Sequence, residues 1–280
     1  MKKITRRSFL AAAGLTAAAL ALTACGGSSS STASSVASSA AASSEVASSS
    51  AAAAELTTVE AGKLTMATNA AFPPYEMTTD AGEFEGIDID TAKAIAEKLG
   101  LELQIDDMDF DAALLSVQQG KADIVMAGVT VTDERKAVMD FSDSYATGIQ
   151  SIIVPEGSDI ASPDDLAGKK IGTQRGTTGY IYCSDDFGDE NVVAYDDGLT
   201  AVQALNNGQV DAVVIDNAPA QEFVAANPGL KVLDTSYAEE DYAIGMAKGS
   251  ALEDAVNKAL EELKADGTLQ AIVDKYINAN

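Results

Sequence analysis

The chain has 280 residues, enough for two compact units or for one large unit with a tail. Its formal net charge of −25 makes nucleic acids and anionic lipid surfaces poor partners, because like charges repel. The sequence contains no His, which excludes a Ser-His-Asp triad, a Cys-His pair and any zinc site built on His.

The first 24 residues have the layout of an export signal. Four Lys and Arg residues within 2–7 precede an apolar run over residues 9–22, which is too short to span a bilayer comfortably. The stretch Leu-Thr-Ala-Cys that ends at Cys25 resembles a bacterial lipobox and implies acylation of this cysteine. A chance Cys after an ordinary signal is the alternative. Residues 5–10 also resemble a twin-arginine signal, so the export route stays open.

Residues 25–61 are expected to form a flexible tether. Residues 28–54 are almost entirely Ser and Ala, which cannot bury enough apolar area to offset the entropy of ordering. A triacylated Cys25 would hold the folded part at a membrane surface through lipid alone. We therefore expect the protein on the outer face of the cytoplasmic membrane or in the periplasm.

From residue 63 onward, short apolar runs alternate with helical patterns, which predicts α/β layers around mostly parallel sheets. In the first expected helix, apolar residues recur at helical spacing and Gly100 marks the end. The expected strands are residues 64–68, 101–105, 123–127, 170–172, 192–195 and 211–215. The expected helices are residues 88–99, 111–119, 178–184, 199–207, 218–226, 252–264 and 268–277.

Two segments, residues 116–126 and 204–214, are near-equivalents of each other. Each ends a helix with Gly and then begins a strand with Asp. The parallel suggests two similar lobes, although a junction of this kind also recurs by chance.

Three stretches carry a family resemblance. Thr68-Asn-Ala-Ala-Phe-Pro-Pro-Tyr-Glu76 leads into Phe84-Glu-Gly-Ile-Asp-Ile-Asp90, and Ala127-Gly-Val-Thr-Val-Thr-Asp-Glu-Arg135 leads into Asp140-Phe-Ser-Asp143. Gly172-Thr-Gln-Arg-Gly-Thr-Thr178 is followed by Val214-Ile-Asp-Asn217. In order and spacing these stretches resemble the polar amino acid binding proteins of ABC importers, the periplasmic binding protein type II group, over residues 63–277.

The resemblance implies a two-lobed α/β fold that closes around one amino acid. Lobe 1 would comprise residues 62–144 plus 243–280, and lobe 2 residues 150–237. Two crossing hinge segments would lie at residues 145–149 and 238–242. The resemblance also implies a monomer that works with an ABC transporter permease in the membrane, without a cofactor or a metal.

The resemblance assigns the two main-chain charges of the ligand to two residues. Arg135 would bind the carboxylate with its planar fork of donors, helped by backbone N–H groups near Thr130 and Thr177. Asp216 would bind the ammonium, completed by the Thr130 hydroxyl and the Gly128 carbonyl. The alternatives are a surface charge for Arg135, a helix N-cap for Asp216 and turn positions for the others.

Phe72 and Phe110 match aromatic positions that sandwich the aliphatic part of the ligand, and core packing is the alternative for both. Side-chain specificity is expected from Asn69, Gln174 and Arg175, with Glu76 as a further candidate. For Arg175 the alternative is a side chain that points to solvent. Because both amides are neutral, they favour a polar uncharged ligand, while a basic ligand stays open.

Two other functions are conceivable on this fold. One is an enzyme similar to cyclohexadienyl dehydratase, which the motifs disfavour because they show no second carboxylate facing Asp216. The other is a ligand-sensing module that docks to a separate partner. Cys183 is expected to be a lone, buried thiol.

Overall fold

The computed structural model describes residues 56–277. The predicted export signal, Cys25 and most of the predicted tether lie outside the described residues. The end of the tether region contacts the fold, in contrast to the expectation of flexibility up to residue 61. The backbone N–H of Val59 donates to Asp123 at 2.7 Å, and Leu56 packs against the core, so ordered structure begins before the first strand.

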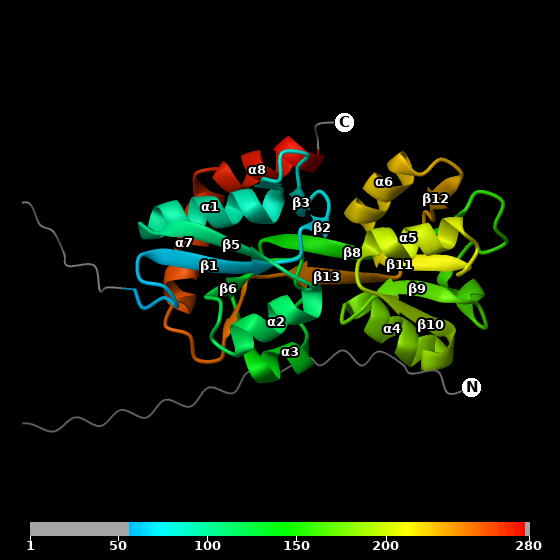
Figure 1. Ribbon diagram of the computed structural model, residues 1–280, viewed down its shortest axis with the longest axis horizontal. Coiled ribbons are helices and arrows are strands. Elements are labelled where there is room, and N and C mark those ends of the chain that lie inside the picture. The colour runs from blue at the N-terminus through cyan, green and yellow to red at the C-terminus, as the bar shows by residue number, and fades with distance from the viewer. Residues whose placement is uncertain (1–55, 278–280) are drawn as a thin grey trace, which may run out of the picture. The chain divides into compact units, whose positions relative to one another are not determined.

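Lobe 1 is built on a five-stranded sheet with the strand order β5-β1-β6-β14-β7 (Figure 1). These strands are β1 (Lys63–Thr68), β5 (Glu102–Asp107), β6 (Ile124–Val125), β7 (Met139–Phe141) and β14 (Gly245–Ala247). A small three-stranded sheet adds β2 (Ala71–Phe72), β3 (Glu76–Thr78) and β4 (Phe84–Glu85). The helices are α1 (Ile87–Leu99), α2 (Phe110–Gln118), α3 (Asp133–Val138), α7 (Glu253–Ala265) and α8 (Thr268–Ile277).

Lobe 2 is built on a sheet with the strand order β10-β9-β11-β8-β12, in which β13 also pairs with β8. Its strands are β8 (Ala146–Pro155), β9 (Ile171–Gln174), β10 (Val192–Tyr195), β11 (Ala212–Asp216), β12 (Leu230–Val232) and β13 (Ala238–Tyr242). Its α-helices are α4 (Thr178–Phe187), α5 (Gly198–Asn206) and α6 (Asn217–Ala226), and its 3-10 turns are Pro163–Leu166 and Asp189–Asn191.

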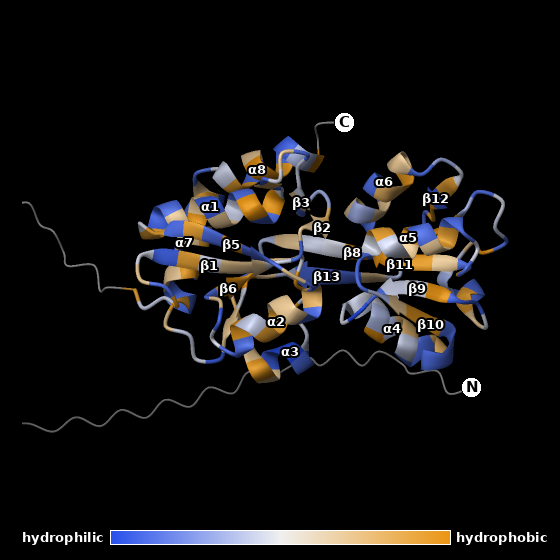
Figure 2. Ribbon diagram, in the orientation of Figure 1, coloured by the Kyte–Doolittle hydropathy of each residue, from blue (hydrophilic) through white to orange (hydrophobic). Residues whose placement is uncertain are grey.

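Helices cover both faces of each sheet because the strands are apolar on both sides. In β1, Leu64 and Met66 join the cluster packed by α1 and α7, whereas Ala67 joins the cluster packed by α2. The same alternation separates Val213 from Val214 in β11. In Figure 2 the helices are orange on one side and blue on the other, as expected for helices with one buried face.

The prediction of mostly parallel sheets is wrong, because both sheets are mixed. In each lobe three strands are parallel: β5-β1-β6 in lobe 1 and β10-β9-β11 in lobe 2. The strands added beside them, β14 and β7 in one lobe and β8, β12 and β13 in the other, are antiparallel. Most of these strands pair with partners far away in the sequence, and helix–strand alternation does not fix the direction of such a strand, so the prediction did not anticipate them.

The prediction of two similar lobes is confirmed at the level of single hydrogen bonds. Gly120 and Gly208, which follow α2 and α5, both have φ of +66°, a left-handed conformation that favours Gly. Asp123 and Asp211 then occupy equivalent places. Asp123 accepts from the backbone N–H of Thr65 at 2.8 Å, and Asp211 accepts from that of Lys170 at 2.8 Å. In each lobe the carboxylate therefore links the third parallel strand in chain order (β6 or β11) to the first (β1 or β9).

The segments predicted to cross between the lobes fall on β8 and β13, which pair as antiparallel neighbours in the middle of the view in Figure 1. Residues 146–149 begin β8, and residues 238–242 form β13. In the register of this pair, Glu240 lies opposite Gly148.

The predicted helices and strands are all present, with ends within three residues of the expected positions. Within residues 56–277, no helix is both long and apolar enough to cross a membrane. The same part of the chain shows no cluster of His, Cys, Asp and Glu suited to a metal ion. Cys183 is buried in lobe 2, as predicted, and burial raises the pKa of its thiol to about 12.

Candidate functional site

The nine residues predicted to bind a ligand line a single cavity between the lobes. They are Asn69, Phe72, Phe110, Gly128, Thr130, Arg135, Gln174, Thr177 and Asp216. The cavity is also lined by Glu76, Ala127 and Thr178. Most of these residues follow the carboxyl ends of β1, β6, β9 and β11, where ligand sites of α/β sheets lie.

Arg135 is buried rather than a surface charge, with 9% of its area exposed. The short helix α3 positions it, because the Thr132 hydroxyl caps the helix by accepting from the Arg135 backbone N–H. One guanidinium nitrogen donates to the Thr130 carbonyl at 2.7 Å, and the other donates to the Gly176 carbonyl of lobe 2 at 3.1 Å. No ion pair joins it to a carboxylate among the described residues.

The surroundings of Arg135 suit it for an anionic group. Burial lowers the pKa of the guanidinium because it removes water from around the charge. For the same reason, a negative group that enters beside it is attracted strongly. The Phe110 ring lies 5.4 Å from the guanidinium carbon, within the range of a cation–π contact. Helix α4 begins at Thr178 in the cavity wall, and its first N–H groups have no acceptor within the helix. Together these groups can hold a carboxylate.

Asp216 ends β11 and lies at the N-cap position of α6, but its side chain makes no capping hydrogen bond. It accepts instead from the side-chain amide of Gln150 at 2.8 Å and from the hydroxyl of Tyr242. The pKa of Asp216 is raised to about 7, first by burial and then by the charge of Glu240. A cation beside Asp216 would stabilise its carboxylate form and so lower this raised pKa.

Glu240 is a site residue that the sequence analysis missed, and it corrects the expectation that no second carboxylate faces Asp216. It lies in β13 with 6% of its area exposed. One carboxylate oxygen accepts from the Thr130 hydroxyl at 3.0 Å and from the Gln150 amide at 3.0 Å. Two carboxylates therefore share one amide N, which makes this end of the cavity strongly negative.

Glu76 and Asp88 add a second negative region. Glu76 lines the cavity, is fully buried, and makes a carboxyl–carboxylate contact with Asp88 rather than a bond to a cation. Asp88 lies beside it and accepts from the Gly128 N–H at 2.9 Å. Burial, followed by the charge of Asp88, raises the pKa of Glu76 well above its usual range, and burial raises that of Asp88 to about 6.

Asn69 and Gln174, predicted to read the ligand side chain, are hydrogen-bonded to each other across the lobes. The Gln174 amide donates to Asn69 at 2.9 Å and to the Asp196 carbonyl at 3.2 Å, while Asn69 donates to the Met108 carbonyl at 3.0 Å. Both amides are thus satisfied within the protein in this closed arrangement.

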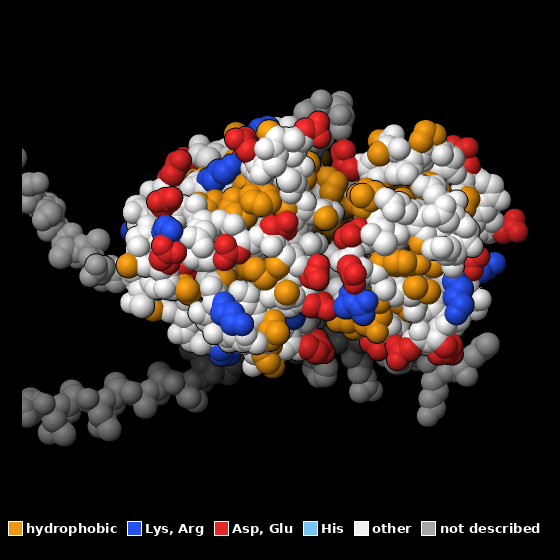
Figure 3. Space-filling model, in the orientation of Figure 1, with side chains coloured by type: hydrophobic (Ala, Val, Ile, Leu, Met, Phe, Trp, Pro, Cys, Tyr) orange, Lys and Arg blue, Asp and Glu red, His pale blue; other side chains and the backbone are white. Residues whose placement is uncertain are grey.

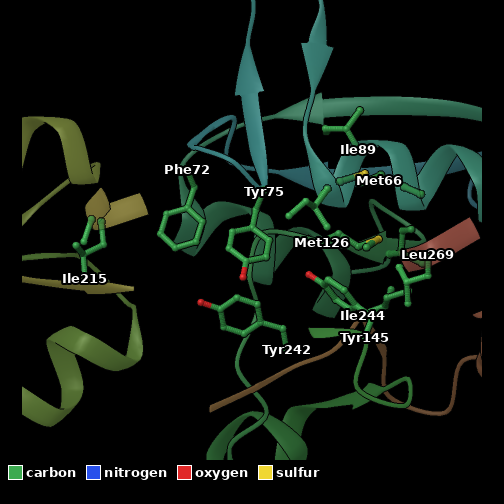
Figure 4. Packing of buried hydrophobic residues seen from close by; sticks show 14 of the residues in the cluster. Met66, Phe72, Tyr75, Ile89, Met126, Tyr145, Ile215, Tyr242, Ile244 and Leu269 are labelled. Carbon is green, nitrogen blue, oxygen red and sulfur yellow. The ribbon is translucent and has the colours of Figure 1, made fainter. Parts of the chain in front are cut away.

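The aromatic residues serve the core and the cavity at once. Phe72 is 7% exposed, lines the cavity and stacks on Tyr75 with ring centroids 5.9 Å apart. The rings of Tyr75 and Tyr242 pack in a T-shaped arrangement with centroids 5.3 Å apart. Figure 4 shows Phe72 beside Tyr75, with the Tyr242 ring below Tyr75. Phe110 likewise lines the cavity and packs in the α2 cluster.

Arg175 does not join the cavity. It is 55% exposed and pairs with Asp196 at 3.4 Å on the outer rim, near Asp109 and Asp111. In Figure 3 acidic side chains gather along the line where the two lobes meet. The expectation that Arg175 reads the ligand side chain is therefore unsupported by its position, whereas Glu76 holds a place where a ligand side chain could reach it.

Comparison with known proteins gives a consistent result. Residues 64–279 match the bacterial extracellular solute-binding proteins, family 3. The L-cystine-binding protein TcyJ of Escherichia coli (strain K12) is 33% identical over 226 residues, which cover 79% of this chain and 85% of that protein.

Two solved structures show the same similarity in three dimensions. The arginine-, lysine-, histidine-binding protein ArtJ from Geobacillus stearothermophilus is 34% identical with a TM-score of 0.74, covering 78% of this chain and 96% of that one. An ancestral arginine-binding protein bound to glutamine is 44% identical with a TM-score of 0.74, covering 77% and 98%.

Proposed function

The chain belongs to the bacterial extracellular solute-binding proteins of family 3, and from this membership we propose that it captures a free amino acid for an ABC importer. We further propose that the amino acid has a basic side chain. The observation that carries the second proposal is the excess of buried carboxyl groups around the cavity. Glu76 and Asp216 line it, Asp88 and Glu240 lie directly behind, and Arg135 is the one buried cation among the described residues.

Each part of a basic amino acid has a partner of opposite charge in this arrangement. The carboxylate meets Arg135 and the first turn of α4. The ammonium meets Asp216 and the Thr130 hydroxyl at the other end. The cationic side chain then extends toward Glu76 and Asp88, which have no cationic partner among the described residues. Burial raises the pKa of Glu76, and a cation beside it would favour the carboxylate form and pair with it, which a neutral side chain cannot do.

This proposal replaces the preference for a polar neutral ligand that the sequence suggested. That preference rested on the amides of Asn69 and Gln174, which bond to each other here. Similarity supports the change, since ArtJ binds arginine, lysine and histidine. Glutamine is nevertheless found in the ancestral arginine-binding protein, so neutral and basic ligands have to be compared directly. The relatives compared above are binding proteins, which favours binding over dehydratase-like chemistry.

The test compares L-arginine with L-citrulline, its neutral analogue of nearly equal shape, by titration calorimetry. We expect arginine to bind at least about tenfold more tightly. In Glu76→Gln the affinity for arginine should fall by about tenfold or more, while that for citrulline stays or improves, because the unpaired carboxyl is gone.

Glu83→Gln provides the matched control, because Glu83 is exposed in the turn that leads into β4. It should leave both affinities unchanged. Equal binding of arginine and citrulline by the unaltered protein would contradict the basic ligand and leave amino-acid capture standing.

The same proposal extends to location and partner. The family is extracellular, in keeping with the export signal and the lipidated Cys25 proposed from the sequence. We propose that the folded lobes are attached to the membrane through this lipid anchor, act as a monomer and deliver the amino acid to a membrane permease.

A further inference from the structure

The two crossing strands carry a polar inner face. Along β8 and β13, side chains alternate between exposed and buried, so that Gln150, Glu240 and Tyr242 point inward while Ile149 and Glu239 point to solvent. These inward groups join each other through Asp216, which binds both Gln150 and Tyr242. The strands that connect the lobes therefore also build one end of the cavity.

Glu240 lies at the centre of this network. Its carboxylate accepts from the Thr130 hydroxyl of lobe 1 and from Gln150 of β8, each at 3.0 Å. The same side-chain NH2 group of Gln150 also donates to Asp216 at 2.8 Å. The other carboxylate oxygen of Glu240 is buried without a hydrogen-bond partner at normal distance in the described structure. The donors to these two carboxylates are neutral groups, including the Tyr182 hydroxyl, and neither carboxylate has an ion pair in the described structure, so an ammonium that enters here would be their first cationic partner.

We propose that Glu240 is a positioning residue for the ligand ammonium: it orients Thr130 and Gln150 around Asp216 and adds a second negative charge that couples capture to proton release. This inference deepens the proposed function and rests on it, since the ammonium must enter beside Asp216. Glu240 acts through these neighbours and through its charge, without having to touch the ligand.

The direction of the proton coupling follows from the state of Asp216. Without a ligand its pKa is about 7, raised first by burial and then by Glu240, so it is largely protonated below that pH. An ammonium favours the carboxylate form and expels the proton. Affinity should therefore be constant above about pH 7 and fall by up to about tenfold per pH unit below it.

Several other charged or titratable groups face this pair. Tyr242 from β13, Tyr75 from the turn between β2 and β3, and Tyr182 from α4 have raised pKa values and stay neutral below pH 8. Arg135 of α3 stays cationic. Burial raises the pKa of Glu76 of β3 well above its usual range and that of Asp88 of α1 to about 6. Both groups are common to the unaltered protein and to variants at residue 240, so the difference between these proteins reports Asp216.

The experiment measures the affinity for L-arginine by calorimetry from pH 5.5 to 8, in buffers with different ionisation enthalpies. The unaltered protein should release protons near pH 6 and lose affinity below pH 7. In Glu240→Gln, the affinity for L-arginine at pH 8 should drop by about tenfold. The further loss of affinity between pH 8 and 5.5 should be smaller than in the unaltered protein. The variant should also discriminate less against 5-guanidinopentanoate, which lacks the ammonium. L-glutamine replaces arginine if it binds more tightly.

Glu239→Gln is the matched control, one residue away on the exposed side of the same strand, and should behave like the unaltered protein. A Glu240→Gln profile that runs parallel to the unaltered one overturns the inference, whether or not overall affinity drops. Absence of proton release by the unaltered protein overturns it without any variant. Failure of the unaltered protein to bind any amino acid instead removes the proposed function, and the inference with it.

Discussion

Arg135 is the residue that we propose binds the ligand carboxylate. Its guanidinium donates to the Thr130 carbonyl of its own lobe, which orients it before a ligand arrives, and to the Gly176 carbonyl of the other lobe when the lobes meet. We expect Arg135→Ala to weaken amino-acid binding by about 100-fold or more, because a buried carboxylate would lose its charged partner. The free energy of unfolding should change by only about 1–2 kcal/mol, since a desolvated charge disappears along with its hydrogen bonds.

Calorimetry and urea unfolding of the same variant measure the two effects. Arg175→Ala is the control, because this exposed side chain pairs with Asp196 outside the cavity. Unchanged affinity in Arg135→Ala would show that the carboxylate binds elsewhere.

Single residues also show what sequence reasoning could reach. Arg135 and Asp216 were predictable because a specific motif contains the first and a strand ends at the second. Glu240 was not, because only the register of β13 against β8 separates it from its neighbour Glu239. The role of Asn69 and Gln174 was also out of reach, because their mutual hydrogen bond joins residues 105 positions apart.

The paired strands β8 and β13 are the element that links the lobes to the site. Gly148 leaves room for the Tyr242 ring: a Cβ here would lie 2.4 Å from the nearest ring atom. We expect Gly148→Ala to displace Tyr242 from Asp216, to lower the free energy of unfolding by about 1–3 kcal/mol and to weaken ligand binding.

Urea unfolding and calorimetry report both effects. Gly157→Ala, just beyond the end of β8, is the matched control, since its Cβ would have nothing within 4 Å and should leave both quantities nearly unchanged. If Gly148→Ala binds and unfolds like the unaltered protein, the close packing of Tyr242 does not matter to the site.

At the same scale, the helices and the buried parallel strands could be predicted, since apolar periodicity marks them. The two- and three-residue strands β2, β3 and β4 are too short to show a period. The strand character of β8 and β13 was hidden as well, because their inner face carries a Gly, a Gln and a Glu instead of apolar residues.

The described part of the chain forms two similar lobes, and several polar contacts join their facing surfaces. Arg135 reaches Gly176, Gln174 reaches Asn69, and Thr130 lies 3.4 Å from the Thr178 hydroxyl. The lining groups are buried, so a ligand enters only when the lobes separate. Closure then buries more carboxyl groups than cations around the cavity, and the proposed cationic ligand would offset this excess.

The most direct test of this account is titration calorimetry of the purified protein against the twenty common amino acids. We predict that one or a few of them bind at a single site in the micromolar range or tighter, with L-arginine among the tightest. Absence of binding by all twenty would contradict the central claim that the cavity between the lobes captures a free amino acid.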